Sequence, residues 1–294
     1  MLNLPKVSGI CRYNVLMSNV TWLRVGGKVD VLFKPRDIQS LMYLIKSTEL
    51  TINIIGATSN IIVRDNGIRG ITVKLGKEFA YIKYKNNNSI IAGGGALLTN
   101  LAYSAMEQQI SGFEFLVGIP GTVGGGLEMN AGSYGGDIAG IVKSIKAVSL
   151  EDGNLYEFSS SEMGYFYRGH NLTGRWIFIE AEFTGVNSEY EIIFHKIKDI
   201  LDKKNKSQPI REKTAGCMFK NPKSEKAWRL IDKSGCRGLN NGKAKVSSKH
   251  CNFLLNYCNA TACDLESLGN NVRNIVRDKF NIELEWEIRV LGNL

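Results

Sequence analysis

A glycine-rich segment is the part of the chain best suited to chemistry. It reads Gly118-Ile-Pro-Gly-Thr-Val-Gly-Gly-Gly-Leu-Glu-Met-Asn-Ala-Gly-Ser-Tyr-Gly135 and interleaves glycine with small and β-branched residues. Glycine loses more conformational entropy on folding than any other residue, so a dense run is expected where the backbone must approach another group closely. Successive backbone N–H groups form anion-binding concavities, which suit a phosphate or pyrophosphate. A flexible linker would carry Ser, Lys and Glu instead of the apolar Phe115, Val117 and Ile119. We therefore predict a cofactor-binding loop.

Thiols and carboxylates are the other candidate reactive groups. The six cysteines form no C-x-x-C pair and the chain has three histidines, so we expect no metal site. Cys217 is the one cysteine to which we assign chemistry. Near the C-terminus Glu283, Glu285 and Glu287 share one face of a predicted strand. That face is either a solvated surface or a wall of an active site.

Charge and composition narrow the class of protein. The net charge is +9, and residues 195–250 hold 16 Lys and Arg against 5 Asp and Glu. This basic segment lacks the interleaved aromatic residues of a base-stacking surface, so we expect an anionic small substrate and no nucleic-acid partner. No apolar run approaches the roughly 18 residues of a membrane span, and residues 1–6 lack the pattern of an export signal. Together with scattered single cysteines, this predicts a cytoplasmic protein without a membrane partner.

The elements that must position these residues follow an α+β order. Residues 29–34 are predicted as a strand, Asp37 as the N-cap of a helix through Ser47, and 51–55 as a buried strand. Short strands are expected at residues 61–64, 70–75, 79–85 and 89–92, and a helix at 97–109. No Gly-x-Gly-x-x-Gly follows a first strand, so the fingerprint of a doubly wound dinucleotide-binding sheet is missing. This absence argues against an ordinary NAD dehydrogenase.

The second half begins with a predicted hairpin. Residues 144–150 and 156–158 alternate in polarity around Asp152-Gly153, which favours a tight turn. A helix is expected over 190–204, and the break at Lys206-Ser-Gln-Pro209 suggests a domain boundary. Beyond it we predict a helix at 225–233, a strand at 252–256, a long helix at 265–279 and a last strand. Thr261 and Asp264 match a capping box at the start of that long helix.

Seven separated motifs, in order along the chain, resemble one family. They are Thr21-Trp-Leu-Arg-Val-Gly-Gly27, Gly56-Ala-Thr-Ser-Asn60, Gly118–Gly135, Tyr165-Phe-Tyr-Arg168, Thr214-Ala-Gly-Cys-Met-Phe-Lys-Asn-Pro222, Lys249-His-Cys-Asn-Phe253 and Leu284-Glu-Trp-Glu-Ile288. Together they resemble the UDP-N-acetylenolpyruvoylglucosamine reductases, flavoenzymes of peptidoglycan precursor synthesis, over residues 20 to 291. The short spacing between Arg168 and Cys217 is similar to the shorter form of that family, which lacks a tyrosine-bearing segment over the substrate.

The resemblance implies a fold and a reaction. It implies a two-part FAD-binding region of the vanillyl-alcohol-oxidase type, at residues 1–83 and 84–207, and a C-terminal α+β substrate domain at 208–294. NADPH would reduce noncovalent FAD, and hydride would pass to C3 of the enolpyruvyl ether of UDP-N-acetylglucosamine-enolpyruvate. Protonation of C2 would then give UDP-N-acetylmuramate. We expect a monomer.

The resemblance also implies binding residues. The FAD pyrophosphate would meet small polar groups and backbone N–H groups, although Ala57 and Thr58 stand where the family usually has glycine. The cofactor-binding residues would be Arg24, Gly56, Ser59, Asn60, Ile119, Gly121, Thr122, Gly124, Gly125, Asn130, Ala131 and Gly132. The candidate substrate contacts are Tyr167, Arg211, Lys220, Asn221 and His250, of which His250 has an equally good interpretation as a structural residue.

Three catalytic residues are carried over from the motifs. Arg168 would face the enolate charge that hydride addition creates, because a guanidinium fork suits a carboxylate. Glu287 would assist the enol, with Glu285 as the alternative, and we expect burial to raise the pKa of that carboxyl. Cys217 stands where the family usually has a serine proton donor, and its basic surroundings would tend to lower the thiol pKa. Lys243 stands where the family tends to have glycine.

Two other functions fit parts of the sequence. Another flavoprotein of the same fold, such as an oxidase with covalent flavin, would need a tethering residue, and before residue 195 only Cys11 and His170 qualify. Neither lies in a predicted cofactor loop. A basic nucleic-acid-binding protein is motivated by residues 195–250 alone.

Overall fold

A computed structural model describes residues 4–85 and 88–293. Residues 1–6, for which we predicted no export signal, lie partly outside the described residues. The chain forms two compact units, and each is assembled from separate stretches of sequence. Unit 1 contains residues 1–12, 31–57 and 70–203, and unit 2 contains residues 13–30, 58–69 and 204–294.

A four-stranded sheet of order β1-β2-β5-β3 is built from the first strands of the chain. Their bounds are β1 Gly9–Leu16, β2 Lys28–Pro35, β3 Ile52–Ile54 and β5 Ile68–Val73. Helix α1, Ile38–Ser47, lies between β2 and β3 in sequence, and the Asp37 side chain accepts a hydrogen bond from Ser40 N at its start. The predicted strand–helix–strand opening and its N-cap are confirmed, whereas the expected burial of the second strand is wrong in part, because Ile54 is exposed. Leu41, Leu44 and Ile45 of α1 face the same core as Phe33 and Ile71.

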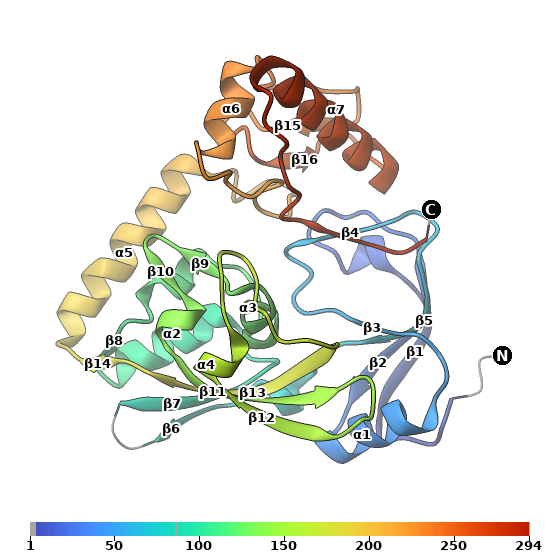
Figure 1. Ribbon diagram of the computed structural model, residues 1–294, viewed down its shortest axis with the longest axis vertical. Coiled ribbons are helices and arrows are strands. Elements are labelled where there is room, and N and C mark those ends of the chain that lie inside the picture. Colours follow the sequence, from blue (N-terminus) through green and yellow to red (C-terminus); the bar gives the residue numbers. More distant parts are fainter. Residues whose placement is uncertain (1–3, 86–87, 294) are drawn as a thin grey trace. The chain divides into compact units, whose positions relative to one another are not determined.

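Unit 1 is centred on a five-stranded antiparallel sheet of order β12-β11-β13-β7-β6. The strands are β6 Ile82–Lys85, β7 Ser89–Gly93, β11 Val142–Ser149, β12 Leu155–Ser159 and β13 Trp176–Thr184. The predicted hairpin is confirmed, with Ala147 of β11 paired to Tyr156 of β12. Helices α2, Leu98–Glu107, and α3, Val123–Met129, cover one face of this sheet (Figure 1).

The remaining elements of unit 1 are short, apart from one long helix. They are η2 Lys77–Phe79, β8 Ile110–Ser111, η3 Glu114–Gly118, β9 Gly132–Ser133, β10 Gly136–Asp137, η4 Ile138–Gly140, α4 Ser160–Met163 and β14 Val186–Asn187. The long helix α5, Tyr190–Ser207, begins in unit 1 and continues into unit 2. It is longer at its C-terminal end than the predicted 190–204.

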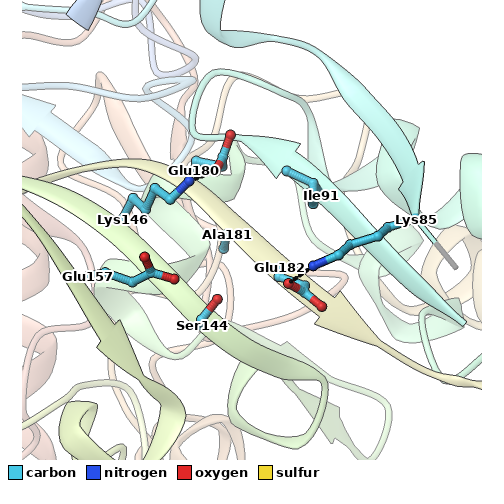
Figure 2. A pocket seen from close by; sticks show the side chains of 8 residues that line it. All are labelled: Lys85, Ile91, Ser144, Lys146, Glu157, Glu180, Ala181 and Glu182. Atoms are coloured by element: carbon cyan, nitrogen blue, oxygen red, sulfur yellow. Dashed lines mark hydrogen bonds and ion pairs between the residues drawn. The ribbon is translucent and has the colours of Figure 1, made fainter. Parts of the chain in front are cut away.

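The other face of the five-stranded sheet is charged. A depression of about 150 Å³ on it is lined by Lys85, Ile91, Ser144, Lys146, Glu157, Glu180, Ala181 and Glu182 (Figure 2). Lys146 pairs with Glu180 at 2.8 Å, and Lys85 and Lys143 pair with Glu182 at 2.9 and 3.0 Å. None of the predicted site residues lines this depression. Because Lys85, Lys146, Glu180 and Glu182 are already engaged in ion pairs, we interpret this face as a solvated surface.

Unit 2 packs α6, Ala227–Lys233, and α7, Ala262–Phe280, with two short strand pairs. The pairs are β15 Ala244–Val246 with β16 Leu254–Asn256, antiparallel, and β4 Ile61–Val63 with β17 Arg289–Leu291, parallel. The 3-10 helix η1, Met17–Asn19, also belongs to this unit. Its core joins Leu23, Val25 and Ile62 to residues of the C-terminal stretch. Among the described residues, no helix combines the length and the apolarity that crossing a bilayer would need.

The end of the chain differs in part from the prediction. Residues 282–288 alternate between buried and exposed as expected, with Leu284 and Ile288 buried and Glu283 and Glu285 exposed. However, the paired strand is β17, Arg289–Leu291, and the earlier residues make one isolated bridge, between Trp286 and Phe219. The α+β class is confirmed.

Candidate active site

The glycine-rich segment is not a loop throughout. It begins at the end of η3, and Val123-Gly-Gly-Gly-Leu-Glu-Met129 forms the helix α3. Thr122 is the N-cap of this helix, and its side chain accepts a hydrogen bond from Gly125 N at 3.3 Å. Glycine costs a helix about 1 kcal/mol relative to alanine, so sequence propensity argues against this helix.

Close packing explains two of these glycines. A Cβ on Gly124 would lie 2.9 Å from the carbonyl oxygen of Phe178, and a Cβ on Gly126 would lie 3.2 Å from two methyl carbons of Leu98. The helix therefore lies almost directly on β13 and α2. Gly125 is exposed, and a Cβ there would meet only Thr122 Oγ1, at 3.5 Å. The tight approach is thus partly to the protein itself rather than to a ligand.

The backbone N–H groups of this segment are mostly committed. Val123 N donates to Ala96 O at 2.8 Å, Gly124 N to Gly94 O at 2.9 Å and Gly126 N to Thr122 O at 2.8 Å. Ile119 N donates to Leu116 O at 3.0 Å. For the N–H groups of Gly121 and Thr122, in contrast, the described part of the chain provides no acceptor. A ligand's anionic group could be held by these two donors.

Gly56 lies directly against that position. A Cβ on Gly56 would lie 2.8 Å from Thr122 Oγ1, so only glycine lets the two backbone segments approach so closely. The predicted cofactor segments at residue 56 and at 118–135 therefore meet within unit 1. Small residues, close backbones and two available N–H donors fit the pyrophosphate of a dinucleotide cofactor.

Asn130 connects two segments of unit 1. Asn130 ends α3 in the left-handed conformation, with φ 42°, and is buried. Its side chain donates to Phe166 O at 3.1 Å and accepts from Ala139 N at 2.9 Å. Asn130 thereby joins the glycine-rich segment to the turn that carries Tyr167 and Arg168.

The turn of Tyr167 and Arg168 is tight. Phe166 N donates to Gly169 O at 3.0 Å and Gly169 N donates to Phe166 O at 3.2 Å, which leaves two residues between the bonded pair. Arg168 has φ 62°, and its guanidinium lies 5.3 Å from the centre of the Tyr167 ring. Neighbouring Tyr165 is half-buried, and desolvation of its hydroxyl together with the charge of Glu128 raises the pKa of that hydroxyl.

Three predicted cofactor residues belong to unit 2. Arg24 is exposed with φ 57°, and its Nη1 donates to Asn19 O at 2.9 Å. Ser59 is buried, and the neighbouring Thr58 adopts φ 60° while its hydroxyl donates to Val20 O at 2.9 Å. The side chain of Asn60 donates to the main-chain oxygen of Glu287 at 2.9 Å.

Unit 2 brings the segments of Cys217 and Glu287 together. Glu287 N donates to Met218 O at 2.8 Å, and Lys220 N donates to Glu285 O at 2.9 Å. Cys217 is half-buried and forms an isolated bridge with Phe253. The thiol and the carboxylate thus belong to adjacent extended segments whose register is set by main-chain hydrogen bonds.

The two candidate carboxylates differ in environment. The Glu285 side chain is 71% exposed and pairs with Lys220 Nζ at 2.5 Å. Glu287 is half-buried. Glu287 is therefore the less exposed of the two candidate carboxylates.

The other predicted substrate residues are dispersed within unit 2. The Asn221 side chain accepts from Ala227 N at 3.0 Å, at the start of α6. Arg211 is exposed in a turn. His250 packs against Phe253 with ring centres 4.8 Å apart, and its buried Nδ1 has no hydrogen-bond partner among the described residues. Burial, with a contribution from the charge of Arg237, lowers the pKa of His250.

Asn252 is a residue that sequence reasoning missed. It is 3% exposed, accepts from Phe219 N at 3.1 Å and donates to Phe219 O at 2.8 Å. Met218 N also donates to Asn252 O, at 2.8 Å. Asn252 therefore fixes the backbone immediately after Cys217. The sequence feature that could have indicated this role is the position of Asn252 in the motif Lys249-His-Cys-Asn-Phe253.

Comparison with known proteins assigns the family. A model described as the C-terminal domain of UDP-N-acetylenolpyruvoylglucosamine reductase matches residues 208–291, and a model described as an FAD binding domain matches 31–159. The UDP-N-acetylenolpyruvoylglucosamine reductase of Wolbachia sp. subsp. Brugia malayi (strain TRS) is 75% identical over 292 residues, which cover 99% of each chain. The chain belongs to the UDP-N-acetylenolpyruvoylglucosamine reductase family.

More distant members of the UDP-N-acetylenolpyruvoylglucosamine reductase family agree. The relative of that name in Anaplasma marginale (strain St. Maries) is 52% identical over 99% of this chain and 96% of its own. A crystal structure of the reductase from Thermus caldophilus matches with a TM-score of 0.84 and 30% identity, over 98% of this chain and 100% of that one. The family and the α+β fold predicted from the motifs are confirmed, and the chain is an FAD-containing oxidoreductase.

Proposed function

We propose that the chain uses NADPH to reduce the enolpyruvyl ether of UDP-N-acetylglucosamine-enolpyruvate to UDP-N-acetylmuramate, a step of peptidoglycan precursor synthesis. The observation that carries the proposal is the register of unit 2, in which Glu287 N bonds Met218 O beside Cys217, in a chain of this family. A thiol and a shielded carboxylate on adjacent segments are groups that can deliver protons.

Unit 1 offers a fitting FAD site. The contact of Gly56 with Thr122, which a Cβ would block, leaves the N–H groups of Gly121 and Thr122 as donors for a pyrophosphate. On the family's motifs we also propose Ile119, Gly124, Gly125, Asn130, Ala131 and Gly132 of unit 1, and Arg24, Ser59 and Asn60 of unit 2, as cofactor-binding residues. FAD, when bound, supplies the hydride chemistry.

The protein's own groups then handle charge and protons. Addition of hydride to C3 leaves an electron pair on C2 and its carboxylate, and Arg168 is proposed to stabilise that negative charge. Cys217 is proposed to donate the Sγ proton to C2, after which solvent reprotonates the thiolate. Glu287 is proposed to share a proton with the enol oxygen. The role of Arg168, which lies in the other unit, is assigned on its motif.

Substrate recognition requires cations and polar groups, because the substrate carries a diphosphate and a carboxylate. We propose Tyr167, Arg211, Lys220, Asn221 and His250 for these contacts. The unpartnered Nδ1 of His250 supports a ligand contact over a purely structural role. The excess of Lys and Arg in residues 195–250 serves the same anionic substrate.

The wider setting is also proposed. We infer a cytoplasmic monomer with no nucleic-acid or membrane partner, and three regions at 1–83, 84–207 and 208–294. The match of the family's C-terminal model from residue 208 supports the last boundary. Size-exclusion chromatography tests the monomer.

One assay decides the main claim. The FAD-loaded protein should oxidise NADPH only when UDP-N-acetylglucosamine-enolpyruvate is present, and mass spectrometry should show a product heavier by two hydrogen atoms. NADH in place of NADPH measures the preference for the phosphorylated nucleotide. A protein that binds FAD but leaves the enolpyruvyl sugar unchanged would contradict the proposal.

A further inference from the structure

The side chain of Asn60 contacts the segment that carries Glu287. Its Nδ2 donates to Glu287 O at 2.9 Å, and Arg289 N donates to Asn60 O at 3.0 Å. Both residues lie in unit 2, 227 positions apart in sequence. Asn60 therefore holds the main chain on both sides of Ile288.

This contact extends a strand pairing that would otherwise stop. Strand β4 pairs with β17 from Ile61 opposite Arg289 onward, so Glu287 lies before the first paired residue. The Asn60 amide supplies a donor to the carbonyl of Glu287 beyond that end of the ladder. Asparagine can do this because its NH2 donates, whereas a carboxylate of the same shape cannot.

The opposite side of Glu287 is also held. Its N–H donates to Met218 O at 2.8 Å, and Asn252 fixes the backbone at Phe219. Both main-chain polar groups of Glu287 are thus bonded, one toward the Cys217 segment and one toward Asn60. A side chain whose backbone is held on two sides starts from a defined position, which catalysis requires to within a fraction of an ångström.

We propose that Asn60 is a positioning residue for Glu287 in the reduction of the enolpyruvyl substrate, acting through the main chain. The proposal rests on the function proposed above. It gives Asn60 a task separate from the cofactor contact expected from its motif, because this side-chain bond is made to the protein rather than to a ligand.

The test separates the two half-reactions. Asn60→Asp keeps the shape but loses the donor, and Asn60→Ala removes the side chain without adding charge. In FAD-saturated, folded protein, stopped-flow reduction of the flavin by NADPH should lose far less rate than the substrate half-reaction, because saturation with FAD offsets a weakened cofactor contact. Reoxidation of reduced flavin by the enolpyruvyl substrate should slow by about 10- to 100-fold in both variants.

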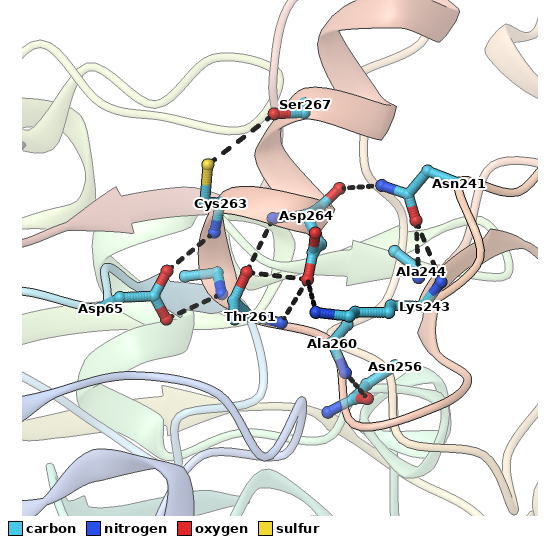
Figure 3. A network of polar contacts seen from close by, with 11 residues as sticks. Asp65, Asn241, Lys243, Ala244, Asn256, Ala260, Thr261, Cys263, Asp264 and Ser267 are labelled. Atoms are coloured by element: carbon cyan, nitrogen blue, oxygen red, sulfur yellow. Dashed lines mark hydrogen bonds and ion pairs between the residues drawn. The ribbon is translucent and has the colours of Figure 1, made fainter.

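Asn241 offers a matched control in the same unit. Its Nδ2 donates to the main-chain oxygen of Asp264 at 2.9 Å, and its side-chain oxygen accepts from Lys243 N and Ala244 N (Figure 3). Asn241→Ala should lower the thermal midpoint while both half-reactions keep their rates. If Asn60→Ala slowed the substrate half-reaction only because it destabilises the fold, Asn241→Ala would slow that half-reaction as well.

A double-mutant cycle completes the test. If Asn60 acts through Glu287, then adding Asn60→Ala to the Glu287→Gln variant should slow the substrate half-reaction by less than about twofold. The reason is that the carboxyl that Asn60 positions is already lost in that variant. An unchanged substrate half-reaction in Asn60→Ala overturns the inference. So does an equal loss in both half-reactions with weaker FAD binding, which would make Asn60 a cofactor residue only. A wild type that cannot reduce the substrate overturns the proposed function instead.

Discussion

Arg168 adopts a backbone conformation that arginine seldom takes. Its φ of 62° lies in the left-handed region, at the third position of the turn from Phe166 to Gly169, where glycine or asparagine is usual. Holding a residue with a Cβ there costs about 1–2 kcal/mol. Arginine at this position is therefore retained at the expense of stability, which is common at functional sites.

Substitution of Arg168 should separate stability from activity. Arg168→Gly relieves the backbone strain, so the free energy of unfolding should stay within about 1 kcal/mol of the wild type. Substrate reduction should fall by about 100-fold or more, because the enolate charge loses its cation, while flavin reduction by NADPH remains. Arg168→Ala should show the same kinetic pattern.

Gln109→Gly is the matched control for Arg168→Gly. Gln109 has φ 56° and no proposed role in the site. This variant should show a similar change in stability and unaltered kinetics. Equal losses of both half-reactions in Arg168→Gly would assign Arg168 to NADPH binding or to folding.

Cys217 is proposed to donate a proton to the substrate, a role that the family usually gives to serine. Cys217→Ser should remain active, whereas Cys217→Ala should lose about 10²–10⁴-fold in substrate reduction, the usual contribution of a general acid. Flavin reduction should be nearly unchanged in both. A fully active Cys217→Ala variant would show that the proton comes from another group.

Alkylation gives an independent measurement of the same thiol. Cys258 and Cys263 are exposed and Cys11 is half-buried like Cys217, so these three are first replaced by serine to leave Cys217 as the main target. Iodoacetamide should then inactivate the protein, bound substrate should protect it, and Cys217→Ser should resist. Activity should also fall at alkaline pH as the thiolate forms, with Cys217→Ser active to higher pH.

At the scale of elements, the start of α7 is held by two carboxylates. Asp65 accepts from Ala262 N and Cys263 N, each at 3.0 Å, and so bonds two of the unpaired N–H groups of the helix (Figure 3). Thr261 and Asp264 form the predicted capping box, which is confirmed. Lys243 Nζ lies 4.0 Å from Asp264, so this lysine contributes at most a weak, exposed ion pair.

Removal of the Asp65 carboxylate should destabilise α7. Asp65→Ala should lower the free energy of unfolding by about 0.5–2 kcal/mol, because two N–H groups lose their acceptor and the helix dipole loses a favourable charge. Urea denaturation measures this change. Asp278→Ala is the control, since an acid near the C-terminal end of α7 should contribute nothing or be slightly unfavourable. An equal loss in both variants would contradict the capping role.

The capping box also predicts a pH dependence. The hydrogen bond from Thr261 N, and to a smaller extent the one from the Thr261 hydroxyl, lowers the pKa of Asp264 below its unfolded value. Its stabilisation is therefore fully present above the unfolded pKa of about 3.9 and is lost as pH falls through the lower folded pKa. Asp264→Asn should be less stable at neutral pH and should lose less stability than the wild type between about pH 5 and about pH 2. Parallel losses in the two proteins would contradict this.

Elements with local signals were predictable, and those set by distant contacts were not. Asp37 before α1, Thr261 with Asp264 before α7, and Asp152-Gly153 between β11 and β12 each announce a structure within a few residues. Helix α3 carries three consecutive glycines, and only its packing on β13 and α2 explains it. The candidate site follows the same rule, because the motifs supplied its residues but no local pattern indicates the bond from Asn60 to Glu287.

At the scale of the whole molecule, FAD should bind reversibly and stabilise the fold. His170, one of the two residues considered for a covalent link, contacts Glu128 at 3.5 Å and packs edge-on against Phe178. Acid precipitation should therefore leave all FAD in the supernatant. Free FAD at about 100 times its Kd should add about 2.7 kcal/mol of stability, seen as a higher thermal midpoint. Flavin retained in the precipitate would favour an oxidase with a covalent cofactor.

Unit 2 is assembled from early and late stretches of the sequence, and this limits when it can fold during synthesis. Strand β4, Ile61–Val63, leaves the ribosome long before its partner β17, Arg289–Leu291. At about 5–20 residues per second, β4 waits roughly 10 to 45 seconds for it. Leu23, Val25 and Ile62 wait as well, since the rest of their core begins at Ala215. A nascent chain that stalls before Arg289 therefore exposes an unpaired strand and orphaned apolar side chains, the features that chaperones and proteases detect.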